Sequence, residues 1–290
     1  MVFGKNRALW GGKVNLIIKR NDSVTSILLF IFNVFLSKQG INEVSIKKIL
    51  RLLEPFEKSE TSIRMGLSRG MQKGLMTSHK KNTEVCYRVT EKAINWFSYW
   101  WHTMQRFEER ITLQQQAWDG KWSIIYTSEN YDEISRALNE YSYGMLGKYL
   151  FISPYNFPDQ IAKLAGRYSN NQSLFIFSSE KVNNKTTEEI VAKAWQIKKL
   201  ALRYKDFTAE LNKISDKLND DNSGSGYELP VLHSLGLKLF DIAQLDPQLP
   251  IKLLPHDWSG IAAYTGFNSL RERLLPGADT FIKSILSENV

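Results

Sequence analysis

A short part of the sequence carries hydroxyl, guanidinium, ammonium and thioether side chains of the kinds that contact duplex DNA. They are Thr61, Ser62, Arg64, Met65, Ser68, Arg69, Lys80 and Lys81. Guanidinium and hydroxyl groups hydrogen-bond to base edges, and cations neutralise backbone phosphates. We therefore expect Arg64 to contact a base, with guanine as the bidentate partner, and Arg69, Lys80 and Lys81 to contact phosphates. A helix-surface ion pair with Glu60 or with a neighbouring element is an almost equally favoured alternative for Arg69. Simple packing is favoured over a thymine-methyl contact for Met65.

Two helices are predicted to position the first six of these side chains. Apolar residues at helical spacing predict a helix over 44–53, and Glu54-Pro55 ends it because proline lacks the N–H that a helix requires. Ser59 then caps a second helix over 60–73, which Gly74 terminates. This second helix should bury Ile63, Leu67 and Met71 and expose its polar side.

A basic hairpin is predicted directly after the helix pair. Residues 75–79 and 84–90 are expected to form strands around a tip at Lys80-Lys81-Asn82-Thr83. A helix pair followed by a cationic hairpin is typical of a winged helix-turn-helix, with one helix in the major groove and the wing on the backbone. The apolar run 27–36 predicts the first core helix beneath this pair.

Positive charge is concentrated in the same part of the chain. Residues 1–110 contain 19 Lys and Arg against 9 Asp and Glu, whereas residues 111–290 contain 19 against 21, for a total of +8. A solvated basic face is the ordinary explanation of such clusters. The coincidence with the predicted helix pair favours a DNA-binding end joined to a nearly neutral remainder.

Composition limits the class of protein further. The chain of 290 residues is 43% hydrophobic, which predicts a globular protein with two or three domains. Its single cysteine, Cys86, cannot form an internal disulfide and suits the cytoplasm. The most apolar run is too short to span a membrane and lacks a signal-peptide cleavage site. We expect no cofactor.

The domain boundaries are predicted from changes in pattern along the chain. We expect an α+β multidomain protein with a basic mobile arm at 1–22, a DNA-binding domain at 23–90 and a linker helix at 91–117. Alternating strands and helices predict a ferredoxin-like middle domain at 118–185, with its helices on one sheet face. A helical C-terminal domain follows at 186–290, with helices over 187–218, 227–245, 259–273 and 278–286.

The sequence resembles the PaaX-like family, bacterial repressors of phenylacetate degradation, from about Thr25 to Ile285. The phrases that carry this resemblance are Leu50–Phe56, Ile63-Arg64, Leu67–Arg69, Trp118–Trp122, Ala194-Trp195, Leu202–Tyr204, Phe207, Asp246–Pro250, Leu253–Pro255 and Asp257–Gly260. The resemblance implies a winged-helix domain, a ferredoxin-like middle domain and a helical C-terminal domain. It also implies a homodimeric repressor on a palindromic operator, released by phenylacetyl-CoA or another acyl-CoA thioester.

One departure from the family pattern affects the predicted DNA contacts. Where the family usually has an apolar residue followed by Asn-Glu-Arg, this chain has Lys58-Ser59-Glu60-Thr61. The usual arginine is thus replaced by Thr61, while Arg64 and Arg69 remain. We expect a different operator sequence, because base-edge contacts set sequence preference.

The effector site is predicted only by residue type. An acyl-CoA needs cations for its phosphates and an aromatic slot for its acyl part. The candidates are Trp195, Lys199, Arg203, Tyr204 and His233. Packing of the two aromatic rings and of the histidine in the core is favoured over ligand contact, since Lys199 and Arg203 share a helix face that an ordinary solvated helix would also present.

Two other classes of function compete with a regulator. No nucleotide-binding, zinc or nucleophile-elbow motif is present in the sequence, so an enzyme is not expected. Some ferredoxin-like domains of the Cas2 family cleave phosphodiesters with a metal held by an aspartate after the first strand, but here only Glu129 lies nearby. The third possibility is a non-specific architectural or RNA-binding role, which sequence-independent, salt-sensitive affinity would reveal.

Overall fold

The computed structural model describes residues 23–128, 131–168, 174–180, 186–218 and 223–288. The described chain forms two compact units, each assembled from separate stretches of sequence. We call residues 105–206 and 242–261 the sandwich unit, and the described parts of 23–104, 207–241 and 262–288 the hairpin unit. The predicted arm at 1–22 lies outside the described residues.

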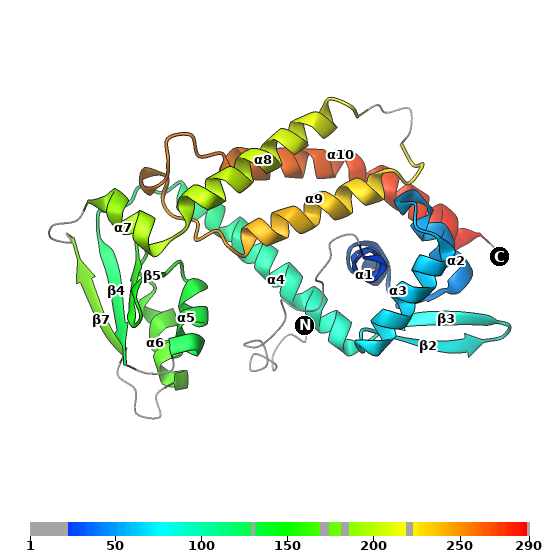
Figure 1. The fold of residues 1–290 in the computed structure, drawn as a ribbon, viewed down its shortest axis with the longest axis horizontal. Coiled ribbons are helices and arrows are strands. Elements are labelled where there is room, and N and C mark those ends of the chain that lie inside the picture. Colours follow the sequence, from blue (N-terminus) through cyan, green and yellow to red (C-terminus); the bar gives the residue numbers. More distant parts are fainter. Residues whose placement is uncertain (1–22, 129–130, 169–173, 181–185, 219–222, 289–290) are drawn as a thin grey trace. The chain divides into compact units, whose positions relative to one another are not determined.

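The hairpin unit begins with three α-helices and a small antiparallel sheet (Figure 1). Their bounds are α1 Val24–Ile31, β1 Glu43–Ser45, α2 Ile46–Leu53, α3 Glu60–Gln72, β2 Met76–Lys81 and β3 Glu84–Val89. A π-helical turn over Phe32–Leu36 continues α1, so the apolar run is helical as predicted. The strand β1 was not predicted, and it shortens the expected helix 44–53 by two residues.

Helix α3 packs unusually closely against α1. The Cβ that any other residue would carry at Gly66 would lie 2.4 Å from the Cβ of Val24, which is closer than real Cβ contacts allow. Thr25 Oγ1 donates a hydrogen bond of 3.0 Å to the carbonyl oxygen of Gly66 at the same crossing. Gly66 therefore allows α3 to pack closely against α1, which fixes the position of α3.

The sheet of this unit has the strand order β1-β3-β2. Its hairpin is in register from the pair Met76 and Val89 to the pair Lys81 and Glu84. The tip is Asn82-Thr83, where Asn82 takes the left-handed conformation (φ +56°). The two lysines assigned to the tip therefore lie at the end of β2 instead.

The remaining helices of the described chain correct two predictions. They are α4 Glu91–Gln114, α7 Thr187–Ala194, α8 Ile197–Ser215, α9 Glu228–Ala243 and α10 Gly260–Ser287. The predicted break between 273 and 278 is wrong, because α10 continues through Pro276. Leu274, Ala278 and Ile282 are all buried on either side of this proline, and that packing outweighs the one backbone hydrogen bond that proline removes.

The continuous helix predicted over 187–218 is also wrong. The chain leaves the helical conformation at Trp195, which is extended (φ −136°, ψ 152°) and separates α7 from α8. The indole ring lies directly over Gly144, where an added Cβ would be 2.4 Å from Trp195 Cε2. The extended conformation of Trp195 therefore coincides with close packing of its ring against β5.

The sandwich unit contains a four-stranded antiparallel sheet with the order β5-β6-β4-β7. Its elements are β4 Trp122–Thr127, α5 Tyr131–Asn139, β5 Gly144–Gly147, β6 Leu150–Ser153, α6 Pro158–Tyr168 and β7 Leu174–Ser179. The βαββαβ sequence with this strand order is the ferredoxin-like arrangement that was predicted. Strand β5, which was not predicted, is short and contains two of the chain's glycines.

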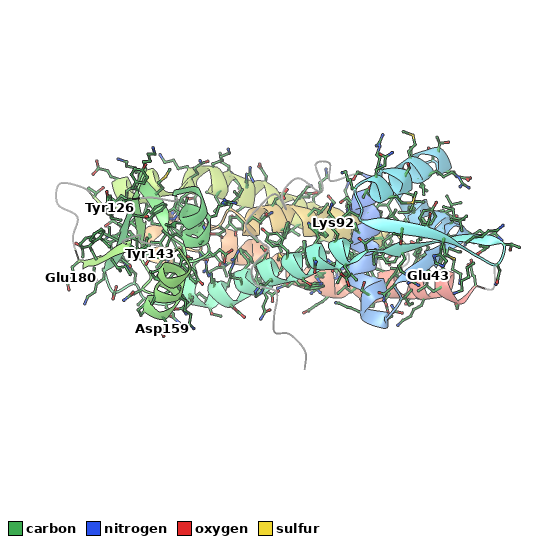
Figure 2. The ribbon with its side chains drawn as sticks, turned by 90° about the horizontal axis from the view of Figure 1, so that it is seen from below. Glu43, Lys92, Tyr126, Tyr143, Asp159 and Glu180 are labelled. Atoms are coloured by element: carbon green, nitrogen blue, oxygen red, sulfur yellow. The ribbon has the colours of Figure 1, made fainter. Side chains whose placement is uncertain are left out.

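Helices α5 and α6 lie on one face of this sheet (Figure 1). Ile125 and Phe151 from the sheet pack there against Ile134 and Ile161. Tyr143 belongs to the same core, and its hydroxyl lies 2.7 Å from Ser123 Oγ (Figure 2). This layer matches the prediction.

Part of the opposite sheet face is also covered, which the sequence did not predict. Trp122 and Ile152 pack there against Ile190 of α7 and Leu249. Strand β4 can serve both cores because alternate residues of a strand point to opposite faces. The first part of the predicted C-terminal domain thus completes the sandwich unit.

None of the described helices is both long and apolar enough to cross a membrane.

Replacing Gly66 with alanine should destabilise the hairpin unit. The new methyl group would overlap Val24, and overpacking of this kind costs about 1–3 kcal/mol. Chemical unfolding followed by circular dichroism measures the change in unfolding free energy.

Gly236→Ala is the matched control, because Gly236 is also helical but has no atom within 4 Å of an added Cβ. Alanine there should be neutral or stabilising by up to about 1 kcal/mol. Equal effects of the two substitutions would contradict the close-packing explanation.

Candidate nucleic-acid interface

Helix α3 begins and ends as the sequence predicts. Ser59 is the N-cap, and its Oγ accepts a hydrogen bond of 3.2 Å from the backbone N–H of Ser62. Ile63 and Leu67 are buried against the rest of the hairpin unit. Gly74 takes the left-handed conformation (φ +66°), so that the chain leaves the helix before β2 begins. The helix is therefore fixed on one side and open on the other.

The open side of α3 carries the residues predicted to contact DNA. Thr61, Ser62, Arg64, Met65 and Arg69 are exposed, while Ser68 is half-buried. Met65 is 50% exposed, so it does not pack in the core of the described chain, contrary to the interpretation favoured from the sequence. Hydroxyl, guanidinium and thioether groups thus share one accessible helix surface.

Arg64 is held by an acidic neighbour one turn earlier. Its Nε and Nη2 lie 2.8 and 2.6 Å from Oε1 of Glu60. Both side chains are more than half exposed, and exposed pairs of this kind contribute about 0–1 kcal/mol. A DNA base or phosphate could therefore replace Glu60 at small cost. Within the described residues Arg69 makes no ion pair, and Glu60 is engaged with Arg64 instead.

The hairpin presents its cations beside a single, largely buried carboxylate. Lys80 and Lys81 are exposed at the end of β2. Glu43 of β1 lies 2.9 Å from Nη2 of Arg88, 3.2 Å from Nε2 of His79 and 3.3 Å from Nζ of Lys81. Partial burial raises the pKa of Glu43, but hydrogen bonds from Arg88 and Lys81 outweigh this and lower the pKa below its usual value. Glu43 is thus held as a carboxylate.

Four of the effector candidates lie in the sandwich unit and do not share one environment. Lys199 and Arg203 are exposed on α8. Tyr204 is completely buried, with its ring centroid 5.1 Å from that of Trp258. Trp195 packs over Gly144 and stacks on Trp122 with centroids 6.4 Å apart. The two cations are therefore exposed to solvent, whereas the Tyr204 ring is buried and the Trp195 ring packs against Gly144.

His233, the fifth candidate, belongs to the core of the hairpin unit. It is 5% exposed, and its Nε2 lies 3.1 Å from Ser26 Oγ. The rings of Phe30 and Phe56 approach it edge-on at centroid distances of 5.2 and 5.8 Å. This is the environment of a packed, hydrogen-bonded histidine, the interpretation favoured from the sequence.

A polar cluster in the sandwich unit was missed by the sequence analysis. Asp246 accepts hydrogen bonds from the Tyr204 hydroxyl (2.5 Å) and from the backbone N–H of Gln248 (2.7 Å). Gln248 takes a left-handed conformation (φ +50°), and its carbonyl accepts a hydrogen bond of 2.7 Å from Tyr155. The only signal in the sequence was an aspartate in a proline-rich loop.

Burial dominates the electrostatics of this cluster. Desolvation raises the pKa of Asp246 to about 6, although hydrogen bonds from Tyr204 and Gln248 and the charge of Arg110 oppose the shift. Desolvation and the nearby charge of Arg106 lower the pKa of Arg110 to about 10. Burial also raises the pKa of Tyr155 above its usual value. The loop 246–248 is therefore fixed by a partly desolvated network.

The described residues contain no group of three or more His, Cys, Asp or Glu side chains placed to bind a metal ion. Glu129, the acid considered for a metal-dependent nuclease, lies outside them.

Comparisons with known proteins cover most of the chain. Residues 23–93 match the PaaX-like protein family, residues 115–191 the PaaX protein central Cas2-like domain, and residues 195–284 the PaaX-like protein C-terminal domain. The search of curated proteins finds no significant match. Among solved structures, the uncharacterized protein Rv0674 from Mycobacterium tuberculosis is 16% identical, with a TM-score of 0.50 over 89% of this chain and 96% of that chain. At that identity the likeness concerns the fold alone.

These findings define the class of protein as a multidomain α+β protein of a family whose members are generally transcription regulators. The chain belongs to the PaaX-like family, whose members are generally regulators of phenylacetate catabolism.

Asp246→Asn should remove a pH-dependent part of the stability. Because the folded pKa of about 6 exceeds the ordinary value of 3.8, the folded state binds more protons between these pH values, and the unfolding free energy falls as pH rises through 6. Each pKa unit corresponds to about 1.4 kcal/mol, which sets an upper limit of about 3 kcal/mol for the whole titration and of about 1.4 kcal/mol between pH 5 and pH 7. Urea unfolding at pH 5 and pH 7 should show a smaller difference for the variant than for the wild type.

Asp257→Asn provides the control, since Asp257 is exposed in the same segment of the chain. It should keep the wild-type difference between the two pH values. An unchanged difference in Asp246→Asn would show that the carboxyl is not destabilised by burial.

Proposed function

We propose that the protein is a sequence-specific DNA-binding transcription regulator, acting as a repressor. The observation that carries this proposal is the exposed polar side of α3 beside the cationic β2–β3 hairpin, in a chain of a regulator family. The order of helices and strands supports a winged helix-turn-helix, in which α3 enters the major groove and the hairpin is the wing. The excess positive charge of residues 1–110 supports the same assignment.

The proposed roles of the side chains follow from their chemistry and exposure. Arg64 contacts a guanine after exchanging Glu60 for the base, while Thr61, Ser62 and Ser68 hydrogen-bond to neighbouring edges or phosphates. Met65 meets a thymine methyl group, and Arg69, Lys80 and Lys81 bind phosphates. The replacement of the family's usual arginine by Thr61 supports an operator different from that of phenylacetate repressors.

A homodimer on a palindromic operator is the form of binding that we propose. Strand β7 is an edge of the sandwich sheet in the described chain, and it exposes Phe175, Ile176 and Phe177 by 49–54%. Phe175 and Phe177 share a sheet face with Tyr126, whose ring lies 6.0 Å from that of Phe175. An exposed apolar edge can pair with a second copy of itself about a two-fold axis.

We further propose that an aryl- or acyl-CoA thioester releases the repressor from DNA. Lys199 and Arg203 are accessible to thioester phosphates, whereas contact with Tyr204 would require the ligand to displace Asp246 from the tyrosine hydroxyl. Such a ligand would favour a different packing of this loop. A preference of about 1.4 kcal/mol for the released conformation suffices for a tenfold loss of operator affinity.

Arg64→Ala separates base reading from charge attraction. DNA selected from total genomic fragments by the purified protein provides the operator, and fluorescence anisotropy compares it with scrambled DNA of equal length. The variant should lose about 1–3 kcal/mol on the selected DNA and much less on the scrambled DNA. Lys80→Ala, the control, should weaken both to a similar extent.

Three results would contradict parts of this proposal. Equal losses on both DNAs with Arg64→Ala would remove its base-reading role. Failure of the selection to enrich any sequence would contradict specific recognition and favour a non-specific binder. Operator binding that phenylacetyl-CoA and a panel of other acyl-CoAs leave unchanged would remove the proposed effector class.

Phe177→Lys should convert a dimer to a monomer, because a lysine in the centre of an apolar edge contact would bury an unpaired charge. Sedimentation velocity measures the change in mass. Leu202→Lys, on α8 and 64% exposed, is the matched control and should leave the mass unchanged. A wild-type monomer at micromolar concentration, or a variant that remains dimeric, would contradict this surface.

A further inference from the structure

Glu43 occupies an unusual position among the cations of the hairpin. Strand β1 pairs with β3 so that Glu43 faces Arg88, and from there its carboxylate also reaches His79 and Lys81 on β2. The Glu43 side chain is only 17% exposed, whereas those of Arg88, His79 and Lys81 are 58, 44 and 67% exposed. Glu43, labelled in Figure 2, is thus a mostly buried acid whose partners Arg88, Lys81 and His79 are accessible.

Arg88, Lys81 and the imidazole of His79 project from one face of the sheet. His79 and Lys81 are two residues apart on β2, and alternate residues of a strand share a face. His79 is paired across the sheet with Cys86, which lies two residues before Arg88. Glu84 lies on the same face but is bound to Lys47 at 3.0 Å. Glu43 is therefore the acid that balances this part of the hairpin.

The donor groups held by Glu43 are those that a phosphate would use. Its Oε2 lies beside Arg88 and His79, and its Oε1 lies beside Lys81. A phosphate that approaches these cations meets a fixed negative charge and must share or take over their N–H groups. Stabilisation of the fold is a weak explanation for the cluster, because the three partners of Glu43 are 44–67% exposed and solvent screens pairs of this kind.

We propose that Glu43 is an intramolecular competitor of DNA phosphate, which sets the sequence-independent DNA affinity of the wing. This inference rests on the proposed DNA-binding function and assigns a role that the base-reading residues of α3 do not have. Glu43 reduces the number of phosphates that the wing neutralises, so the protein leaves duplex DNA more readily. A weaker phosphate contact also lets a modest ligand preference release the operator.

Substitution of Glu43 tests the proposal on the full chain. Glu43→Gln keeps the size and the hydrogen-bonding oxygen but removes the charge, and Glu43→Thr removes the charge with a residue that suits a strand. The control Glu272→Gln removes the same charge from an exposed position on α10 of the same unit. Circular dichroism and thermal unfolding verify that each variant is folded.

The readout is anisotropy on random duplex DNA over a series of KCl concentrations. Both Glu43 variants should bind on the order of tenfold more tightly, which corresponds to about 1.4 kcal/mol. The slope of log K against log [KCl] should become steeper by about 0.9 for each additional phosphate that the wing neutralises. Glu272→Gln should change neither quantity by a comparable amount.

A double-mutant cycle localises the effect to the wing. Lys81→Gln should weaken binding to random DNA more in the Glu43→Gln background than in the wild type, because only there is the lysine free of its internal partner. Equal losses in the two backgrounds would overturn the proposed competition.

The remaining outcomes distinguish the two proposals. Wild-type binding to random DNA with unchanged or weaker binding by both Glu43 variants would overturn the role of Glu43 and leave DNA binding intact. No binding of duplex DNA by the wild type at low salt would overturn the proposed function itself, and this inference with it.

Discussion

The crossing of α1 and α3 at Gly66 determines where the exposed side of α3 can lie. The absence of a side chain at Gly66 lets the two helix backbones approach, and Thr25 Oγ1 then donates to the Gly66 carbonyl. Gly70, one turn later, lies close to Met76 at the start of β2, where an added Cβ would be 3.3 Å from the Met76 sulfur. Gly66 and Gly70 thus lie where α3 packs against α1 and against the start of β2.

The exposed polar side chains of the hairpin unit are positioned by ion pairs within the chain. Side chains that donate to DNA must be accessible, and accessible cations attract counter-ions. Here the counter-ions are supplied by the chain, since Glu60 holds Arg64 and Glu43 holds Lys81 and Arg88. Such pairs keep long side chains in defined positions while costing little to exchange. Order in the free protein and availability to DNA are therefore compatible.

Local signals predicted the parts of the fold that local interactions control. Ser59, Gly74 and the strand Trp122–Thr127 have the predicted roles because caps, left-handed glycines and apolar alternation act within a few residues. The exposed side of α3 followed from the same helical periodicity. The ion pairs of the hairpin did not, because Glu43 reaches its partners across two strands from a segment that had no predicted strand.

Longer-range packing explains the predictions that were wrong. Nothing near Pro276 in sequence reveals that Leu274 and Ala278 are buried on both sides of it, so a helix break was expected. Trp195, which follows the end of α7, packs against Gly144, which lies far earlier in the sequence. The second core of the sandwich unit likewise joins Trp122 to Leu249, residues that no local pattern connects.

Long-range packing also determines where the effector candidates lie, and residue type alone did not predict it. Residue type grouped Lys199, Arg203 and Tyr204 on one helix, but α8 turns the cations to solvent and the tyrosine to Asp246. Phosphates bound at Lys199 and Arg203 would therefore lie away from the buried ring. A ligand that uses both must extend past the helix or alter the 246–248 loop, whose network of Tyr204, Asp246 and Gln248 is already complete. In the proposed mechanism, the binding energy of the ligand would have to break that network, and the 246–248 loop would then differ between the DNA-bound and released states.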